Sequence, residues 1–595
     1  CAVLVFEVDH LFESLGCLGV HSVVELDLAF EGQCGAACGA PGILGGISYG
    51  QVSGRFFQIA EDLFHDLRLG GAGFAVGQVD LFDKLVSPKG YTPHQYNDRL
   101  SSQQRARCVY LNRLAGYCHK QGLRFYLQAK ELSFPADLLA AHPQLIDKDG
   151  SIRFDVEFWC QYLADKLTLL CQQIPAMSGL LVALSNTDGL LPVSRPNWEL
   201  TGQDDPSPHI DPRSLSRYTQ CFSAMARAMM RENKHLVLRA FPAGNHDIAN
   251  VMEAVRTLPE CVSVSIKLTP ERFWPTFPNN PALLDVENRD VWVELDLVGE
   301  EVGWGVFPFP RIDELQGRLL WCRGNTSING AVCKTSWEGV DNHWIIGTLS
   351  ECNLVACSQL LAREDEHLTR AALLTHWLDE CYGWRPDEAT FEEFQSLMAQ
   401  AGQVLYQAIY VRDHVFHRHS QVPASYGQAV WSLYGQLNRN HWLPGSERDI
   451  FFSASDVETS GRNLSLIAEE KDGAWQAAVT LREQALAFAE RAAFPYSLQK
   501  RWQEEWQGFD LYCLLFRHAQ KAFFTLHFAR LVENSWSMRE ICKVNIQELY
   551  RCAAEMDSFC AQHTDASPGL HVMFDPTRVR MLADSLSHEL TQLKG

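Results

Sequence analysis

The sequence predicts an α/β fold, a (β/α)8 TIM barrel followed by a C-terminal all-helical domain. Short apolar strands alternate with amphipathic helices over roughly the first 385 residues, and such alternation is typical of a parallel sheet covered by helices. About eight strands fall within roughly 320 residues, the usual span of such a barrel. An open doubly wound sheet is the alternative. It is disfavoured because no Gly-rich dinucleotide-binding loop follows an early strand.

Each strand is predicted from a short apolar run, and each helix from an apolar periodicity of about 3.6 residues. Strands are expected at Ser22–Leu28, Gly73–Val79, Leu123–Lys130, Leu180–Ser185, His235–Phe241, Val262–Lys267, Val291–Asp296 and Gly330–Thr335. Helices are expected between them at Gln58–Arg68, Gln103–Gln121, Phe158–Gln173, Ser214–Glu232 and Ala249–Thr257. The first 20 or so residues show no regular pattern, and Gly32–Gly50 has the composition of a loop.

The strand pattern ends after Leu354–Tyr382, which we expect to be the closing helix of the barrel. Long helical patterns follow at Phe391–Val411, Leu464–Arg491, Tyr496–Glu533 and Met538–Gln562. We therefore predict an N-terminal stub with the first barrel strand at 1–50, a catalytic barrel at 51–385 and a helical domain at 386–595.

Composition narrows the possible functions. The net charge of −21 argues against a nucleic-acid partner. No apolar run of about 18 residues predicts a membrane span. The 19 cysteines have no repeating spacing, which favours reduced thiols and a cytoplasmic location. Cys34 and Cys38 lack a second pair, so zinc is not expected. The chain opens at Cys1 rather than Met, and we expect residues upstream of it.

The strands Val262–Lys267 and Val291–Asp296 carry the most informative pattern. In each, apolar residues face outward and alternate with an inner face that becomes polar at its C-terminal end. Catalytic side chains of parallel barrels gather where strands meet their following loops. The rim is expected to collect Lys130, Asp188, Arg239, Lys267, Glu294, Asp296, Glu300 and Lys334, with Glu301 beside them.

This set suits the hydrolysis of an acidic sugar. Carboxyl groups can supply a general acid and a general base, and basic groups suit an anionic substrate. Trp159, Trp198, Trp274, Trp292, Trp304, Trp337 and Trp344 offer rings for sugar stacking, although most tryptophans simply pack. A structural role as buried ion pairs is equally open for each charged residue. Trp292 and Glu294 are expected to fill the barrel or support the site.

The remaining motifs favour no cofactor. His414, His417 and His419 have a spacing that would bring them together on a helix as a metal site, but a solvated polar face is the favoured interpretation. The sequence contains no Gly-rich phosphate loop and no serine nucleophile elbow. We therefore expect neither a metal nor an organic cofactor.

Several segments resemble one known family. They are Ile266–Pro275, Glu294–Gly303, IPAMSGLLVALSNTDG, LVLRAF, GLRFYLQAKELSFP, RFFQIAEDLFHDLRLGGAGF and INGAVCKTSWEGVDNHWIIGTLSECN. Together they are similar to the α-glucuronidases of glycoside hydrolase family 67, inverting enzymes that remove glucuronic acid from xylan fragments. The likeness covers roughly residues 55 to 385, and its specificity lies in the shared order and spacing.

The resemblance implies roles for four residues. Asp188 falls on the general acid if one inserted residue is allowed, and Glu300 falls on a base carboxylate. Arg239 and Lys267 fall on residues that hold the uronate carboxylate.

The chain also departs from the family. The second base carboxylate is replaced by Arg272, with Glu271 beside it, and a carboxylate-binding Lys is replaced at Ala183 or Leu184. The family's large N-terminal domain is absent or reduced.

These observations predict an inverting glycoside hydrolase for an α-linked, acidic sugar of an oligosaccharide, with Asp188 as acid and Glu300 as base. Glu271, Asp296 and Glu294 are candidates for catalytic support. Substrate binding is assigned to Arg239, Lys267, Arg272, Lys130, Trp274, Trp304 and Lys334. The alternatives are a barrel that binds carbohydrate without cleaving it and an α-glycosidase for neutral or amino sugars. A homodimer through the helical domain is expected from the resemblance.

Overall fold

The computed structural model describes most of the chain in separate stretches. They are residues 2–7, 73–77, 85–92, 98–120, 122–184, 193, 210–240, 248–270, 272–286, 288–324, 327–335, 345–362, 368–435, 442, 452–564 and 566–593. Predicted elements at Ser22–Leu28 and Gln58–Arg68 lie outside these residues.

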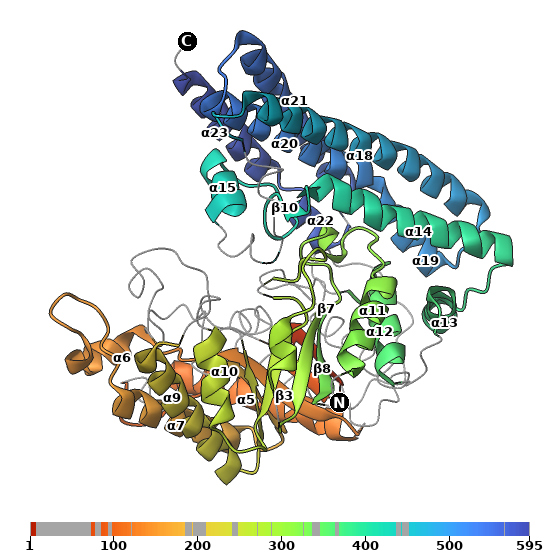
Figure 1. Ribbon diagram of the computed structural model, residues 1–595. Helices are drawn as coiled ribbons and strands as arrows, with labels where there is room; N and C mark the ends of the chain where they lie inside the picture. The colour runs from red at the N-terminus through yellow and green to blue at the C-terminus, as the bar shows by residue number, and fades with distance from the viewer. Residues whose placement is uncertain are drawn as a thin grey trace. The chain divides into compact units, whose positions relative to one another are not determined.

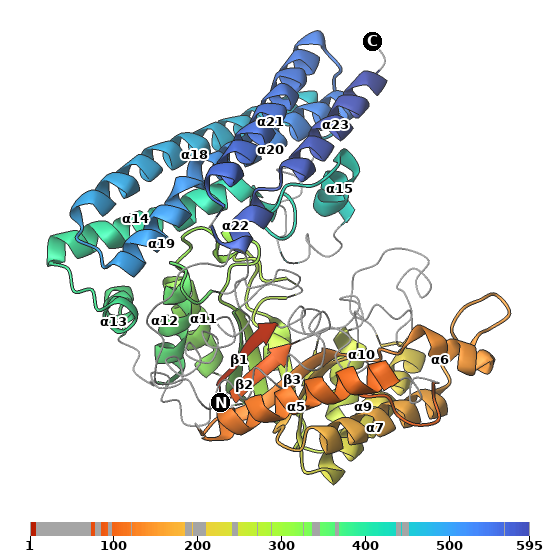
Figure 2. The same ribbon diagram turned by 180° about the vertical axis from the view of Figure 1, so that it is seen from behind.

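Eight strands form one sheet whose order follows the chain and closes on itself from β1 to β8. The strands are β1 (Ala2–Glu7), β2 (Gly73–Gly77), β3 (Arg124–Lys130), β4 (Gly179–Ala183), β5 (His235–Arg239), β6 (Ser263–Lys267), β7 (Val291–Asp296) and β8 (Ile328–Lys334). Continuous parallel registers join β1 through β6. Figure 2 shows β1, β2 and β3 side by side.

The helices that accompany the strands follow the predicted alternation with one exception. They are α5 (Asp98–Lys120), α6 (Ala136–Ala141), α7 (Val156–Gln173), α9 (Pro212–Arg231), α10 (Ile248–Arg256), α11 (Ile312–Arg323), α12 (Glu351–Ala362) and α13 (Arg370–Tyr382). Between β6 and β7 the described residues form only the short 3-10 turn η4 (Pro281–Leu284). The α/β class is confirmed, whereas eight complete β/α units are not seen in the described residues.

One strand lies where no regular pattern was recognised. β1 occupies Ala2–Glu7, and its sequence AVLVFE is a short continuous apolar run. Such a run is consistent with a buried parallel strand, but periodicity cannot separate it from a helical segment. The expected closing helix Leu354–Tyr382 is two helices, α12 and α13, because Thr369 caps a new N-terminus through the backbone N–H of Ala372.

The inside of the sheet is filled by side chains from β3, β4, β5, β7 and β8. Tyr126, Leu181, Val237, Trp292 and Val332 form one buried cluster. The Tyr126 and Trp292 rings meet edge to face with centroids 5.6 Å apart. This confirms that Trp292 points inward and fills the barrel. The outward faces of β6 and β7 are also buried. The two sets of alternating residues in each strand therefore pack on opposite sides of the sheet.

The C-terminal part of the chain is helical, as predicted. It contains α14 (Glu388–Ile409), α15 (Tyr426–Val430), the π-helical turn η6 (Trp431–Gly435), α18 (Val457–Arg491), α19 (Tyr496–Gln507), α20 (Phe509–Leu531), α21 (Trp536–Gln562), α22 (Pro568–Met573) and α23 (Pro576–Gln592). Figure 1 shows α14, α18, α20 and α21 as long neighbouring helices. A two-strand hairpin, β9 (Tyr410–Val411) and β10 (His414–Val415), follows α14.

The predicted helix Tyr496–Glu533 is broken at Gly508 into α19 and α20. A Cβ at this position would come within 2.8 Å of the Phe574 ring, so the close approach requires glycine. No helix among the described residues has a stretch long and apolar enough to cross a bilayer.

The chain divides into two compact units. The first comprises Cys1–Ile266, Ala282–Glu294 and Thr326–Cys333, and the second comprises Lys267–Pro281, Leu295–Asn325 and Lys334–Gly595. The ends of β6, β7 and β8 and their following loops therefore group with the helices after residue 334. This division departs from the predicted boundary at residue 385, because these loops are packed into the second unit rather than standing as a separate rim.

A close contact inside the sheet gives a test of this packing. A Cβ on Gly330 of β8 would lie 2.4 Å from Cδ1 of Trp292. We expect Gly330→Ala to lower the free energy of unfolding by about 1–3 kcal/mol, since the ring must shift within a filled core. Urea denaturation measures the change.

Gly116→Ala in α5 is the matched control, because nothing lies within 4 Å of the added Cβ. It should stabilise the protein by about 0.5–1 kcal/mol through helix propensity. Equal effects at the two positions would contradict the described packing of Trp292.

Candidate active site

Asp296 ends β7 and organises the loop that follows. Its carboxylate accepts hydrogen bonds from the backbone N–H of Val298 at 3.2 Å and of Glu300 at 2.9 Å. The loop turns at Gly299, whose φ of 70° lies in the left-handed region that favours glycine. An aspartate that binds the backbone two and four residues ahead fixes a tight turn. Asp296, predicted as catalytic support, therefore fixes the backbone of the loop that carries Glu300.

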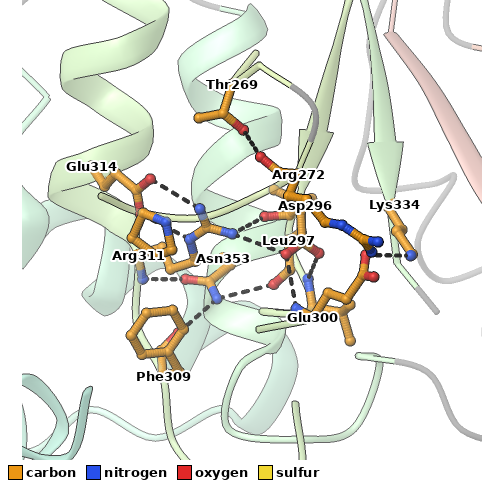
Figure 3. Close-up of polar contacts among 12 residues, drawn as sticks. Thr269, Arg272, Asp296, Leu297, Glu300, Phe309, Arg311, Glu314, Lys334 and Asn353 are labelled. Carbon is orange, nitrogen blue, oxygen red and sulfur yellow. Dashed lines mark hydrogen bonds and ion pairs between the residues drawn. The ribbon is translucent and has the colours of Figure 1, made fainter. Parts of the chain in front are cut away.

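A buried polar network holds Asp296 in turn. Arg311 donates from Nη1 to the Asp296 carboxylate at 3.3 Å and to its carbonyl oxygen. Asn353 of α12 donates from Nδ2 to the carbonyl oxygens of Leu297 and Phe309, and its Oδ1 accepts from the backbone N–H of Arg311 (Figure 3). Buried polar groups that are all paired make a rigid arrangement.

Helix α11 links this loop to the loop after β6. Glu314 binds Arg311 and Arg318 at 2.9 Å each. Arg318 also donates to Asn279 Oδ1 and to the carbonyl oxygens of Pro275 and Phe277. Burial raises the pKa of Glu314, but Arg311 and Arg318 outweigh it and hold the pKa below its ordinary value. The helix therefore sets the spacing of two site loops.

Glu300 lies at the centre of the site, beyond the end of β7. Its Oε2 is 2.9 Å from Nζ of Lys334, which ends β8, and its Oε1 is 3.3 Å from Nδ1 of His419. The Glu300 side chain is 12% exposed, Lys334 19% and His419 27%, so the group reaches the surface. Burial raises the pKa of Glu300, but Lys334 and His419 outweigh burial and hold it well below its ordinary value. Glu300 is therefore ionised at neutral pH.

Glu301 is the buried neighbour of Glu300. It is 1% exposed, and its Oε2 accepts a hydrogen bond from the backbone N–H of His419 at 2.6 Å. Its Oε1 is buried and has no hydrogen-bond partner among the described residues. Burial, followed by the charge of Glu300, raises the pKa of Glu301 to about 8. At neutral pH one carboxyl group of the pair is ionised and the other is protonated.

Arg272 supplies a positive charge that no carboxylate neutralises within the described part of the chain. Its backbone is fixed, because its carbonyl oxygen accepts a hydrogen bond from Thr269 Oγ1 at 2.7 Å. Its charge lowers the pKa values of Glu301 and His419, after the larger effects of burial, so it lies near both. Figure 3 shows the side chain directed toward Glu300 and Lys334. The guanidinium has no ion-pair partner among the described residues.

The site also contains a set of possible metal ligands. One atom each from Glu300, Glu301 and His419 lies within 4.8 Å of the others. Lys334 already binds Glu300, and Arg272 lies close by, so two positive charges occupy the region that a cation would need. The two positive charges, Lys334 and Arg272, favour an anionic ligand over a cation. That the active protein uses no metal stays a prediction.

Other predicted residues lie elsewhere. In the first unit, Arg239 binds Glu294 through two hydrogen bonds of 2.8 and 2.9 Å, and Ser265 donates to the same carboxylate. The carboxylate that Arg239 grips is thus part of the protein, and a contact with substrate stays a prediction. Lys267 lies over the Phe273 ring, 4.8 Å from its centroid. Lys130 ends β3; its side chain, like Asp188 and Glu271, lies outside the described residues.

The prediction that Trp274 and Trp304 stack on substrate is wrong. Each is 1% exposed. Trp274 packs against Phe277 and Tyr410, with ring centroids 4.7 and 6.4 Å away. Their ring faces are used by the protein core, as for most large aromatic side chains.

Neither interpretation of the three histidines holds. His414 lies in β10 and the others in the loop after it, so they share no helical face, and His414 and His417 are buried rather than solvated. His417 binds Ser432 Oγ at 2.7 Å and Arg578 Nη2 at 2.9 Å. His419 alone reaches Glu300. Its role was missed because the loop lies about 120 residues beyond Glu300 in the sequence.

Comparisons with known proteins support the fold. No family model matches the sequence, and no curated protein matches it. The structure is similar to that of a GH138 enzyme targeting pectin rhamnogalacturonan II, with a TM-score of 0.58 and 10% sequence identity. The match covers 91% of this chain and 62% of that chain, so this chain spans less than two thirds of the enzyme. The resemblance to family 67 finds no support in these comparisons.

The raised pKa of Glu301 predicts a pH dependence of stability. Its pKa is about 8 in the folded state and near 4.5 when unfolded, so its contribution is complete below about pH 4.5 and is lost as pH rises through 8. Relative to Glu301→Gln, the wild type should lose up to about 1.4 kcal/mol per pH unit in this window. Urea denaturation at pH 5, 6.5 and 8 measures the difference.

Glu253→Gln, at a partly exposed position on α10, controls for the loss of one carboxylate. Parallel stability curves for the wild type and Glu301→Gln would show that Glu301 ionises normally.

Proposed function

We propose that the protein is a glycoside hydrolase that removes an α-linked uronic acid from an oligosaccharide. The observation that carries the proposal is the charge arrangement around Glu300. An ionised carboxylate stands at the carboxyl end of a sheet strand, beside a lysine that it pairs with and an arginine that pairs with no carboxylate in the described part of the chain. Catalytic groups of α/β barrels lie at this end of the strands. The structural likeness to a GH138 enzyme is consistent with this class.

Glu300 is the proposed general base. A base must be ionised before it can take a proton from water, and the low pKa of Glu300 meets this requirement. Lys334 and His419 fix its two oxygens, so that it needs little reorganisation to act. The partial exposure of Glu300 lets a water molecule or sugar approach the carboxylate.

The general acid is proposed to be Asp188, as the family resemblance implies. Glu301 is a poor candidate for this role, because it is almost fully buried and one of its oxygens lies within 4.8 Å of Glu300. Inverting hydrolases separate their two carboxyl groups by about 6.5–9.5 Å to admit a water molecule. An inverting reaction therefore needs an acid from another strand end.

Arg272 is the proposed ligand of the uronate. With Glu301 protonated and Glu300 paired with Lys334, no carboxylate among the described residues compensates the charge of Arg272. A guanidinium binds a carboxylate through two parallel hydrogen bonds, which gives both affinity and orientation. Arg272 would thus take the place of the lysine that the family uses near its acid.

Glu300→Gln tests the base. A panel of aryl α-glucuronides, α-galacturonides and neutral α-glycosides first identifies a substrate of the wild-type protein. We expect the substitution to lower kcat by a factor of about 10²–10⁴, the usual contribution of a general base. The melting temperature and the circular dichroism spectrum check folding, and Glu253→Gln serves as a control.

Near-normal turnover by Glu300→Gln would exclude Glu300 as the base. Tight uronide binding with no product from the wild type would instead favour the non-catalytic carbohydrate-binding alternative. The anomeric form of the first product, followed by NMR, reports whether the reaction inverts.

Arg272→Gln tests recognition of the acid group. The loss of a charged, two-bond contact should raise KM for the uronide by about 10–100-fold, while a neutral glycoside with the same leaving group should be bound as before. Arg272→Lys keeps the charge but not the planar fork, and it should restore only part of the affinity. An equal loss for acidic and neutral substrates would contradict a role in carboxylate binding.

A further inference from the structure

The hairpin after α14 ends in a loop with unusual backbone geometry. Strands β9 and β10 are joined at Arg412 and Asp413, both with positive φ, as expected for a tight two-residue turn. Farther along the same loop, His419 and Ser420 have φ of 65° and 51°. Neither is glycine, and this region costs such residues about 1–2 kcal/mol each. The conformation persists only where the surroundings hold it.

The contacts that hold this loop come from the catalytic loop and from one helix. The backbone N–H of His419 donates to Glu301 Oε2 at 2.6 Å, and Ser420 Oγ donates to the carbonyl oxygen of Glu300 at 2.9 Å. From α20, the Tyr512 hydroxyl donates to the carbonyl oxygen of Ser420. The loop is thus bonded to both residues of the acidic pair. Among the described residues, this contact is the only hydrogen bond that the Glu301 carboxyl group makes.

The consequence of these contacts is the position of one imidazole. Nδ1 of His419 lies 3.3 Å from Glu300 Oε1, opposite the Lys334 contact to Oε2. The other two histidines of the segment have other neighbours, since His417 binds Ser432 and Arg578 and the ring of His414 lies beside that of Trp274. The strained backbone therefore serves to direct His419 at the carboxylate.

The groups facing His419 decide its protonation. Glu300 and Glu301 face it from the loop after β7, Arg272 from the loop after β6, and Arg418 precedes it in its own loop. Burial lowers the pKa of His419; Glu300 opposes this, while Arg272 and Arg418 lower it further. A neutral ring with its proton on Nδ1 turns the positive end of that N–H dipole toward Glu300, 3.3 Å away, and so favours the ionised carboxylate.

We infer that His419 is a positioning residue of the catalytic site, carried by the C-terminal helical part of the chain. Its ring fixes Glu300 through the 3.3 Å contact of Nδ1 with Oε1, while Glu301 and Ser420 hold its loop in place. The inference rests on the proposed role of Glu300. According to this inference, the helical region supplies a side chain that contacts Glu300. The buried Glu301 then serves to hold the His419 loop rather than to transfer a proton.

The first experiment tests the contact without any substrate. The full chain, labelled with ¹³C at its histidine rings, is titrated by NMR, and the resonance missing from His419→Asn assigns His419. We expect Glu300→Gln to lower the titration midpoint of His419 by about one pH unit, because the carboxylate that favours the charged ring is gone. The resonance of His376 on α13 should not change.

An unchanged midpoint in Glu300→Gln would overturn the inference and leave the proposed hydrolase untouched. Conversely, the midpoint can shift as expected even if no glycoside is cleaved, so the two proposals fail separately.

The second experiment uses the substrate found in the panel. His419→Gly removes the ring, and His419→Asn keeps a donor near the position of Nδ1; both residues tolerate the left-handed backbone, so neither adds strain. We expect His419→Gly to lower kcat about 10–100-fold with little change in KM and to move the acid limb of the kcat/KM profile to higher pH. His419→Asn should restore part of both.

An equal loss of activity in the two variants, or an acid limb that stays in place in His419→Gly, would show that the loop matters only for structure. Either result would overturn the role assigned to the ring.

Discussion

Two adjacent carboxyl groups cannot both ionise when they are buried, and the organisation of the site follows from this constraint. Glu300 and Glu301 are consecutive residues in a loop held by buried polar contacts. Among the described residues, Lys334 and His419 contact Glu300, whereas Glu301 accepts one hydrogen bond, from a backbone N–H, and this difference separates the two pKa values. One member of the pair is thus charged, and the other binds the His419 loop as a neutral acid.

The same constraint explains why the site needs residues from distant parts of the sequence. A single loop after β7 could not supply two partners on opposite sides of one carboxylate. Lys334 comes from the end of β8, where its carbonyl oxygen accepts a hydrogen bond from the backbone N–H of Leu297. His419 comes from the loop after the β9–β10 hairpin. The grouping of these segments in one compact unit is therefore a requirement of the electrostatics as well as of packing.

Sequence reasoning located seven of the eight strands, β2 to β8, because they follow from local patterns. Alternation along β7 placed Trp292 inside, and the position of Glu300 just beyond a strand end marked it as a candidate. The same reasoning could not predict the contact between His419 and Glu300, since no local sequence pattern relates the two residues. It also misjudged Trp274 and Trp304, because whether a ring is exposed depends on tertiary packing. The split of long helical patterns at Gly508 likewise depended on a distant contact with Phe574.

The chain of charges along α11 has a consequence for how such a site can change over evolutionary time. Asp296, Arg311, Glu314 and Arg318 tie the base of the loop that bears Arg272 to the base of the loop that bears Glu300. The loop that bears Glu300 cannot drift without breaking the buried Asp296–Arg311 ion pair, and the loop that bears Arg272 cannot drift without breaking the hydrogen bonds that Arg318 donates to it. Arg272 itself contributes no ion pair to this scaffold within the described residues. In the proposed hydrolase, a new sugar preference would therefore arise most readily by exchanging that one side chain on an unaltered frame, while the proposed base would keep its position.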